Sequence, residues 1–223
     1  MSIRLKIVVS VYRLGMHMVE VMYVSWRDVI DLCYKIAIDV ANSGYEPNAI
    51  VAILRGGVVP ALVLSDILGV EEFYAIRIKH WGIAKEVYTI PLVEQLPQRK
   101  LQGVKVLLVD EVADTGKTLV KAVEELKKLG ALEVKTAVLH LKSSSIVIPD
   151  YYAVKLDKWV WIFYPWSLAE TLFSLAYREL GNKANREDVI AVIEQLVETL
   201  DVEHYRREVI EMALKFYAKK QFK

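Results

Sequence analysis

The chain has 223 residues, of which 54% are hydrophobic and 26% charged, and its formal net charge is +1. This length suits one substantial α/β core with an appendage, and the balanced charge gives no basic excess of the kind that nucleic-acid binding requires. The single cysteine, Cys33, excludes an internal disulfide and a cysteine-rich zinc site.

The first 24 residues are interpreted as an N-terminal extension. Ile7 to Val11 is apolar, but five residues are too few for the core of a signal peptide, and Arg13 interrupts the run. No window approaches eighteen uncharged apolar residues, so no membrane-spanning segment is predicted. These observations favour a cytoplasmic protein.

Apolar periodicity switches repeatedly between strand and helix patterns along the chain. The first expected elements are a helix over 25–42, a strand over 49–54, a helix over 58–68, and two strands over 72–79 and 86–92 joined by a hairpin around Trp81-Gly82. They are followed by a mobile loop over 93–103, a strand over 104–109, a helix over 117–129 and a strand over 134–141. The chain then continues with an extended segment over 151–163 and helices over 167–180, 185–200 and 203–220.

Strands that alternate with helices predict an α/β fold with a mostly parallel, doubly wound sheet and a C-terminal helical extension. We therefore divide the chain into an N-terminal extension (1–24), a central domain (25–181) and a helical extension (182–223). In such a fold, ligands bind at the carboxyl ends of the strands. Both Arg55-Gly56-Gly57 and the loop that follows Asp110 are expected to lie at such ends.

The loop from Ala113 to Thr118 is suited to bind phosphate. It lies where a helix is expected to begin, and unpaired backbone N–H groups and the positive end of the helix dipole favour an anion there. The hydroxyls of Thr115 and Thr118 add donors, and Gly116 lets a phosphate approach the backbone closely.

The Gly-Lys-Thr sequence inside this loop raises the question of an ATP-binding P-loop. That motif requires another glycine five positions before Gly116, and position 111 is Glu, so the P-loop is excluded. The acids Asp110, Glu111 and Asp114 instead suit a ligand with both hydroxyls and phosphate. Carboxylates can take ribose hydroxyls or a magnesium ion, while the loop takes the phosphate.

The whole segment resembles the signature of the type I phosphoribosyltransferases, which bind 5-phosphoribosyl-1-pyrophosphate. The resemblance implies that Asp110 and Glu111 bind the ribose hydroxyls and Mg²⁺. It implies that Asp114 lies near N7 of a purine and moves a proton on the base. The residues that it assigns to the 5′-phosphate are Ala113, Asp114, Thr115, Gly116, Lys117 and Thr118.

The same resemblance gives roles to two further segments. Arg55-Gly56 is similar to the family's pyrophosphate loop, in which the preceding peptide bond, here Leu54–Arg55, is often cis. Lys142 with Trp161-Ile162 resembles the purine pocket of the xanthine-guanine and hypoxanthine-guanine phosphoribosyltransferases. There the lysine donates to O6, the tryptophan stacks on the ring, and the next residue reads the base edge through its main chain.

Three positions depart from that pocket or compete with it. Trp159 would share a strand face with Trp161 by the period of two, and competes for the stacking role. Phe163 stands where an acid is expected, and the Ser-Tyr of the family's flexible loop is missing near Arg77 to Trp81.

The resemblance implies a purine phosphoribosyltransferase of salvage metabolism that acts on guanine, hypoxanthine or xanthine and forms a homodimer or a higher homo-oligomer. Two alternatives stay open. One is an enzyme that prefers adenine, orotate or uracil, and the other is a regulator that senses phosphoribosyl pyrophosphate without turnover. The regulator would ordinarily carry a nucleic-acid-binding segment, and none is recognisable.

Overall fold

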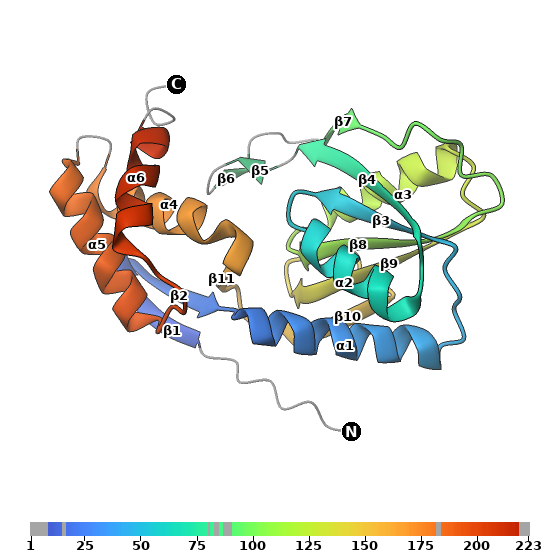
Figure 1. Cartoon of the computed structure of the whole chain (residues 1–223), viewed down its shortest axis with the longest axis horizontal. Helices are drawn as coiled ribbons and strands as arrows, with labels where there is room; N and C mark the ends of the chain where they lie inside the picture. Colours follow the sequence, from blue (N-terminus) through green and yellow to red (C-terminus); the bar gives the residue numbers. More distant parts are fainter. Residues whose placement is uncertain are drawn as a thin grey trace. The chain divides into compact units, whose positions relative to one another are not determined.

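The computed structural model describes residues 9–14, 17–79, 81–82, 85–86, 91–181 and 184–218 (Figure 1). These residues form two compact units. The first contains Arg27–Trp159, and the second joins the residues up to Trp26 to those from Val160 onward. The sequence-based boundaries at 24/25 and 181/182 do not coincide with this division, because the N-terminal strands share a unit with the C-terminal helices.

A six-stranded sheet forms the centre of the first unit, in the order β10-β9-β8-β3-β4-β7. All neighbouring strands are parallel except β7, which pairs antiparallel with β4 at the edge. The central strands are buried on both faces, as their unbroken apolar sequences predict. The predicted fold class is therefore confirmed. The strands are β3 (Ala49–Leu54), β4 (Glu72–Lys79), β7 (Leu92–Gln95), β8 (Lys105–Ala113), β9 (Glu133–Lys142) and β10 (Tyr151–Leu156).

The helices of this unit are α1 (Trp26–Asn42), α2 (Val58–Leu68) and α3 (Lys117–Lys128). The connection β3-α2-β4 and the connection β8-α3-β9 lead away from the middle of the sheet in opposite directions. Because such crossovers are right-handed, α2 and α3 cover opposite faces of the sheet (Figure 1). The strand order therefore reverses between β3 and β8, which is where a doubly wound sheet binds its ligands.

The second unit combines a small sheet with helices. The hairpin of β1 (Val9–Leu14) and β2 (His17–Tyr23) is extended by β11 (Trp161–Phe163), which runs parallel to β2. The sequence analysis predicted neither β1 nor β2. The short 3₁₀ turn Pro165–Ser167 then leads into α4 (Leu168–Leu180), α5 (Arg186–Thr199) and α6 (Arg207–Tyr217), which confirm the three predicted helices.

Three local predictions need correction. Residues 93–95, predicted as part of a mobile loop, belong to β7 because they complete the edge of the sheet beside β4. Trp81-Gly82, predicted as a turn, is strand β5 and pairs with β6 (Lys85–Glu86); residues 80, 83–84 and 87–90 lie outside the described residues. The extended segment 151–163 is interrupted after Leu156, so Trp159 and Trp161 do not share a strand.

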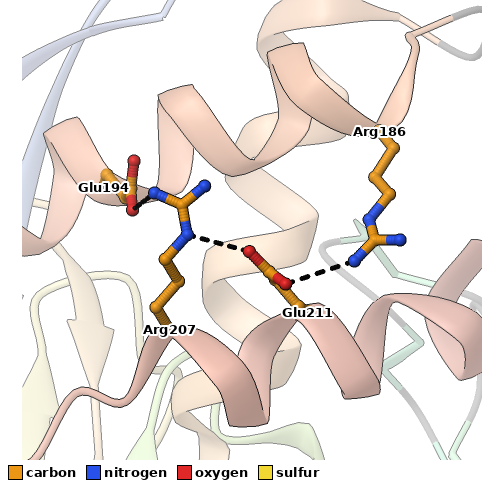
Figure 2. A network of polar contacts seen from close by, with 4 residues as sticks. All are labelled: Arg186, Glu194, Arg207 and Glu211. Atoms are coloured by element: carbon orange, nitrogen blue, oxygen red, sulfur yellow. Dashed lines mark hydrogen bonds and ion pairs between the residues drawn. The ribbon is translucent and has the colours of Figure 1, made fainter.

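Ion pairs join the two C-terminal helices on their exposed side (Figure 2). Arg207 of α6 pairs with Glu194 of α5 at 2.6 Å and with Glu211 at 2.8 Å, and Glu211 also accepts from Arg186 at 3.2 Å. Exposed pairs of this kind contribute little to stability, because water and salt screen the two charges. They therefore fix how α6 lies along α5 more than they stabilise the fold.

The apolar core of the second unit provides the larger share of stability. Ile193 of α5 is fully buried in the cluster that joins α4, α5, α6 and the small sheet.

No helix in the described part of the chain is long and apolar enough to cross a membrane.

Replacing Ile193 with alanine is expected to lower the free energy of unfolding by about 2–5 kcal/mol, the usual cost of truncating a buried isoleucine. The matched control is Met212→Ala, because Met212 is 50% exposed on α6 and its loss should cost less than about 0.5 kcal/mol. Urea unfolding of both variants measures the difference. Equal losses would show that α5 does not carry the core of this unit.

Candidate active site

The loops after β3 and β8 meet at the point where the strand order reverses. The two strands pair in register, Ala52 beside Val109, so they end next to each other. A Cβ atom at Gly56 would overlap the carboxylate of Glu111, and one at Gly57 would overlap the carbonyl oxygen of Val109. The obstacle at Gly57 is backbone, so only glycine leaves room there, whereas the Glu111 carboxylate is the end of a flexible side chain. This packing brings the predicted pyrophosphate loop against the predicted acid pair.

The peptide bond Leu54–Arg55 is cis, as the family resemblance implied. It lies directly between β3 and the loop Arg55-Gly56-Gly57, whose two glycines pack against the end of β8. The backbone of this loop is tied to α2, because Ala61 donates to the carbonyl oxygen of Gly57 at 3.0 Å. The loop is thus held from both sides.

Asp110 and Glu111 form the acid pair. They lie within β8 and not after its end, because pairing with β9 continues as far as Ala113 beside Leu141. Asp110 accepts a hydrogen bond from the backbone N–H of Glu111 at 2.8 Å. Burial and the neighbouring charge of Glu111 raise the pKa of Asp110 well above its ordinary value.

A cation beside this pair would favour the ionised form of both acids. Carboxylate oxygens fit Mg²⁺, which is commonly bound by one or two carboxylates together with phosphate groups of a substrate. Among the residues that the structure describes, no group of three or more His, Cys, Asp or Glu side chains is arranged to hold a metal ion. Two acids of the chain plus oxygens of the substrate are therefore the donor set that fits.

The predicted phosphate loop, 113–118, begins at the last residue of β8, and its last two residues form the start of α3. Gly116 has a left-handed backbone with φ +77°. The segment after β9 braces the loop: Ile146 donates its backbone N–H to the carbonyl oxygen of Thr115 at 3.0 Å. A Cβ atom at Gly116 would come within 2.5 Å of Ser145 Oγ and 2.8 Å of Val147 Cγ2.

Gly116→Ala is expected to destabilise the protein by more than about 1 kcal/mol and to abolish phosphate binding at the loop, because the new methyl group must displace Ser145 or Val147. Gly103→Ala is the control. Its φ is also +77°, but nothing lies within 4 Å of the added Cβ, so it should show only the conformational cost. Thermal melts with and without inorganic pyrophosphate or ribose 5-phosphate compare the two. If the two variants behave alike, the segment after β9 that contains Ser145 and Val147 moves aside at little cost in free energy.

Lys142 and Asp114 form a buried ion pair at the ends of β9 and β8. Lys142 Nζ lies 3.0 Å from Asp114 Oδ2, and the two side chains are only 6% and 17% exposed. Ser144 Oγ lies 3.0 Å from Oδ1 of Asp114 and 3.0 Å from its carbonyl oxygen. Burial lowers the pKa of Lys142, and the charge and hydrogen bond of Asp114 counteract that effect.

Two aromatic side chains complete the surroundings of Lys142. The Trp159 ring centroid lies 4.5 Å from Lys142 Nζ. His140 lies two residues earlier on the same face of β9 and is 1% exposed. Burial and the charge of Lys142 lower the pKa of His140 to about 4, so its imidazole is neutral near pH 7. Lys142, and not His140, is thus the cationic group at this end of β9.

The sequence analysis identified Asp114 and Lys142 but not the side chains that hold them. The Ser-Ser-Ser run after Lys142 was the available signal for Ser144. Trp161 and Ile162 lie in β11 of the second unit, where the Arg178 guanidinium carbon is 5.9 Å from the Trp161 ring centroid. Their predicted place beside a bound base stays a prediction.

The comparisons with known proteins agree with this geometry. Residues 22–171 match the family model described as "Phosphoribosyl transferase domain". The chain is 31% identical over 153 residues to xanthine-guanine phosphoribosyltransferase of Cereibacter sphaeroides, an alignment that covers 66% of this chain and 87% of the relative. It is 33% identical over 158 residues to xanthine phosphoribosyltransferase 1 of Saccharomyces cerevisiae, which covers 62% of this chain and 75% of the relative.

Among solved structures, the purine phosphoribosyltransferase from Pyrococcus horikoshii superposes with a TM-score of 0.57 at 38% identity, over 65% of this chain and 92% of the other. The family match ends at residue 171, within α4. Helices α5 and α6 therefore lie outside it.

Proposed function

Because this chain belongs to the family of phosphoribosyl transferase domains, we propose that it transfers the 5-phosphoribosyl group from phosphoribosyl pyrophosphate to N9 of a 6-oxopurine. The products are the nucleoside monophosphate and pyrophosphate. Guanine, hypoxanthine and xanthine are the candidate bases. The relatives named above are purine, xanthine-guanine and xanthine phosphoribosyltransferases, which supports a purine substrate.

The buried pair of Lys142 and Asp114 is the observation that carries this proposal. Its two polar ends lie 3.0 Å apart, and a 6-oxopurine presents O6 and N7 side by side on one edge. The ammonium can donate to O6, while the carboxylate can accept from N7–H. The 6-amino group of adenine would instead place a donor against a donor.

The proposed reaction needs little covalent chemistry from the chain. The bond from C1′ to the pyrophosphate oxygen breaks, the bond from N9 to C1′ forms, and the proton on N7 passes to Asp114. Because the ribose passes through an oxocarbenium-like state, carboxylates beside it stabilise the developing positive charge. Asp110 and Glu111 are the proposed acids, and they would also take the ribose hydroxyls.

The remaining groups of the substrate are assigned by the same proposal. Arg55 and Gly56 hold the pyrophosphate, and the loop from Ala113 to Thr118 holds the 5′-phosphate through its backbone N–H groups and hydroxyls. A magnesium ion at Asp110 and Glu111 would neutralise charge on the departing pyrophosphate. Trp161 would stack on the base, and Ile162 would contact the base edge through its main chain.

An assay of the purified protein with phosphoribosyl pyrophosphate, Mg²⁺ and each of guanine, hypoxanthine, xanthine, adenine, orotate and uracil tests the proposal. Nucleotide formation from one or more 6-oxopurines, ahead of the other bases, is the expected result. A preference for adenine, orotate or uracil would support the first alternative. Tight binding of phosphoribosyl pyrophosphate without turnover of any base would support the regulator.

A homodimer or higher homo-oligomer is part of the same proposal. Helix α2 follows the proposed pyrophosphate loop, and it exposes the apolar side chains Leu62 (62%) and Ile67 (40%). A helix that is apolar on all sides is ordinarily covered. A second copy of the chain would cover this one, and light scattering measures the resulting mass.

A further inference from the structure

We propose that Trp159 sets the base selectivity of this site by shielding the Lys142 ammonium from water. The inference rests on the proposed function, and it concerns a residue that the sequence placed only as a competitor for base stacking. Trp159 acts through Lys142 and is therefore a positioning residue.

The backbone explains how Trp159 reaches Lys142. Lys142 is the last residue of β9 and lies beside Leu156, the last residue of β10. The N–H of Ser143 donates to the carbonyl oxygen of Leu156 at 3.1 Å, so the two strand ends are tied together. The chain turns after Leu156 and leaves Trp159 with its ring centroid 4.5 Å from Lys142 Nζ.

The contacts of the ammonium show what this ring does. Lys142 is 6% exposed, whereas Trp159 is 47% exposed. The indole thus lies between the lysine and solvent. The face of an aromatic ring is a poor hydrogen-bond partner, so the ring covers the ammonium and excludes water without occupying its donors. Asp114 accepts from one N–H at 3.0 Å, and an ammonium carries two more N–H groups that can donate to a bound base.

Shielding matters because of how a hydrogen-bond donor distinguishes a 6-oxopurine from adenine. The donor favours the 6-oxopurine strongly only when water cannot take the place of the O6 acceptor that adenine lacks. With adenine bound, a buried ammonium faces the 6-amino group and loses a partner, which is costly. If water could enter, it would satisfy the ammonium and reduce that cost. Trp159 therefore acts mainly by lowering kcat/KM for adenine, and its removal should raise kcat/KM for that base.

Trp159→Ala is expected to lower the ratio of kcat/KM for hypoxanthine to that for adenine by about 2- to 30-fold, the range for losing a cation–aromatic contact. Part of the change should be a gain for adenine, which a general structural defect would not produce. Trp159→Phe keeps a ring over Lys142 and should fall between the alanine variant and the parent.

Trp26→Ala is the matched control, because Trp26 is similarly exposed at 43% and its ring packs against Trp166, with the ring centroids 5.9 Å apart. It should keep the parent ratio. A Trp159→Ala protein with the parent ratio, or one that loses activity equally on all bases, would overturn the inference.

A second measurement does not depend on turnover. Nuclear magnetic resonance of ¹³C-methylated lysines reports the pKa of Lys142, with Lys142→Arg used to assign its signal. Burial is the main cause that lowers this pKa, so Trp159→Ala should raise it toward the ordinary value for lysine. An unchanged pKa refutes the shielding. Absence of nucleotide formation by the parent protein would refute the proposed function instead, and leave this measurement intact.

Discussion

Asp114→Asn is expected to lower kcat for the preferred base by about 100- to 10,000-fold, the range for losing a group that moves a proton in the transition state. Asparagine has nearly the same shape, and its one carbonyl oxygen can still accept from Lys142 while its NH2 group donates to Ser144 Oγ, but it cannot take the proton from N7. Binding of phosphoribosyl pyrophosphate should survive, because the loop holds the 5′-phosphate through its backbone. Steady-state kinetics and calorimetric titration measure the two quantities.

Asp150→Asn controls for the loss of a hydrogen-bonded carboxylate elsewhere in the first unit. Asp150 accepts from the N–H and the hydroxyl of Thr136 at 2.8 and 2.9 Å, at the opposite end of β9 from Lys142. It should lower stability and leave kcat unchanged. Near-parental turnover in Asp114→Asn would remove Asp114 from the proposed mechanism.

Lys142→Met is expected to reverse the order of the bases. A hydrogen bond to a charged group contributes about 1.5–3 kcal/mol, so kcat/KM for 6-oxopurines should fall by about 10- to 150-fold relative to adenine. Methionine keeps much of the aliphatic volume beneath Trp159, which limits the damage to packing. The six-base assay measures the change.

Stability must be measured beside selectivity in this variant. Removing one partner of a buried pair typically costs about 3–5 kcal/mol, because the other charge loses its counter-ion. Asp114 keeps Ser144 as a neighbour, and it is 17% exposed, so the loss should be at the low end. Thermal melts of Lys142→Met and of the double variant with Asp114→Asn separate this cost from the effect on the base. An equal fall for every base would show that Lys142 does not contact the purine edge.

The sequence predicted the first unit well because its signals are local. Unbroken apolar strands such as Ala49–Leu54 identify a parallel sheet, and Gly69, with φ +65°, ends α2 where expected. The order of strand, loop and helix then places the phosphate loop at a strand end. The cis bond at Leu54–Arg55 was available only from the family resemblance.

Strand β2 was missed in part because one of its two partners lies far away in the chain. It pairs with its neighbour β1 and also with β11, which comes more than a hundred positions later. Trp159 was misplaced because the period of two was carried past Leu156, where the strand ends. The side chains around Asp114 come from the turn after β9, and no spacing along the sequence specifies that contact.

The packing of Gly57 against β8 also constrains how this protein can change over evolution. A Cβ atom at position 57 would overlap the backbone carbonyl oxygen of Val109 and come within 2.8 Å of that of Ile53. Because these are backbone atoms, no substitution at position 53 or 109 removes them. Position 56 is freer to vary, since the atoms that a Cβ would meet there belong to the end of the flexible Glu111 side chain. Glycine at position 57 is therefore expected to persist in any relative in which the chain follows the same path.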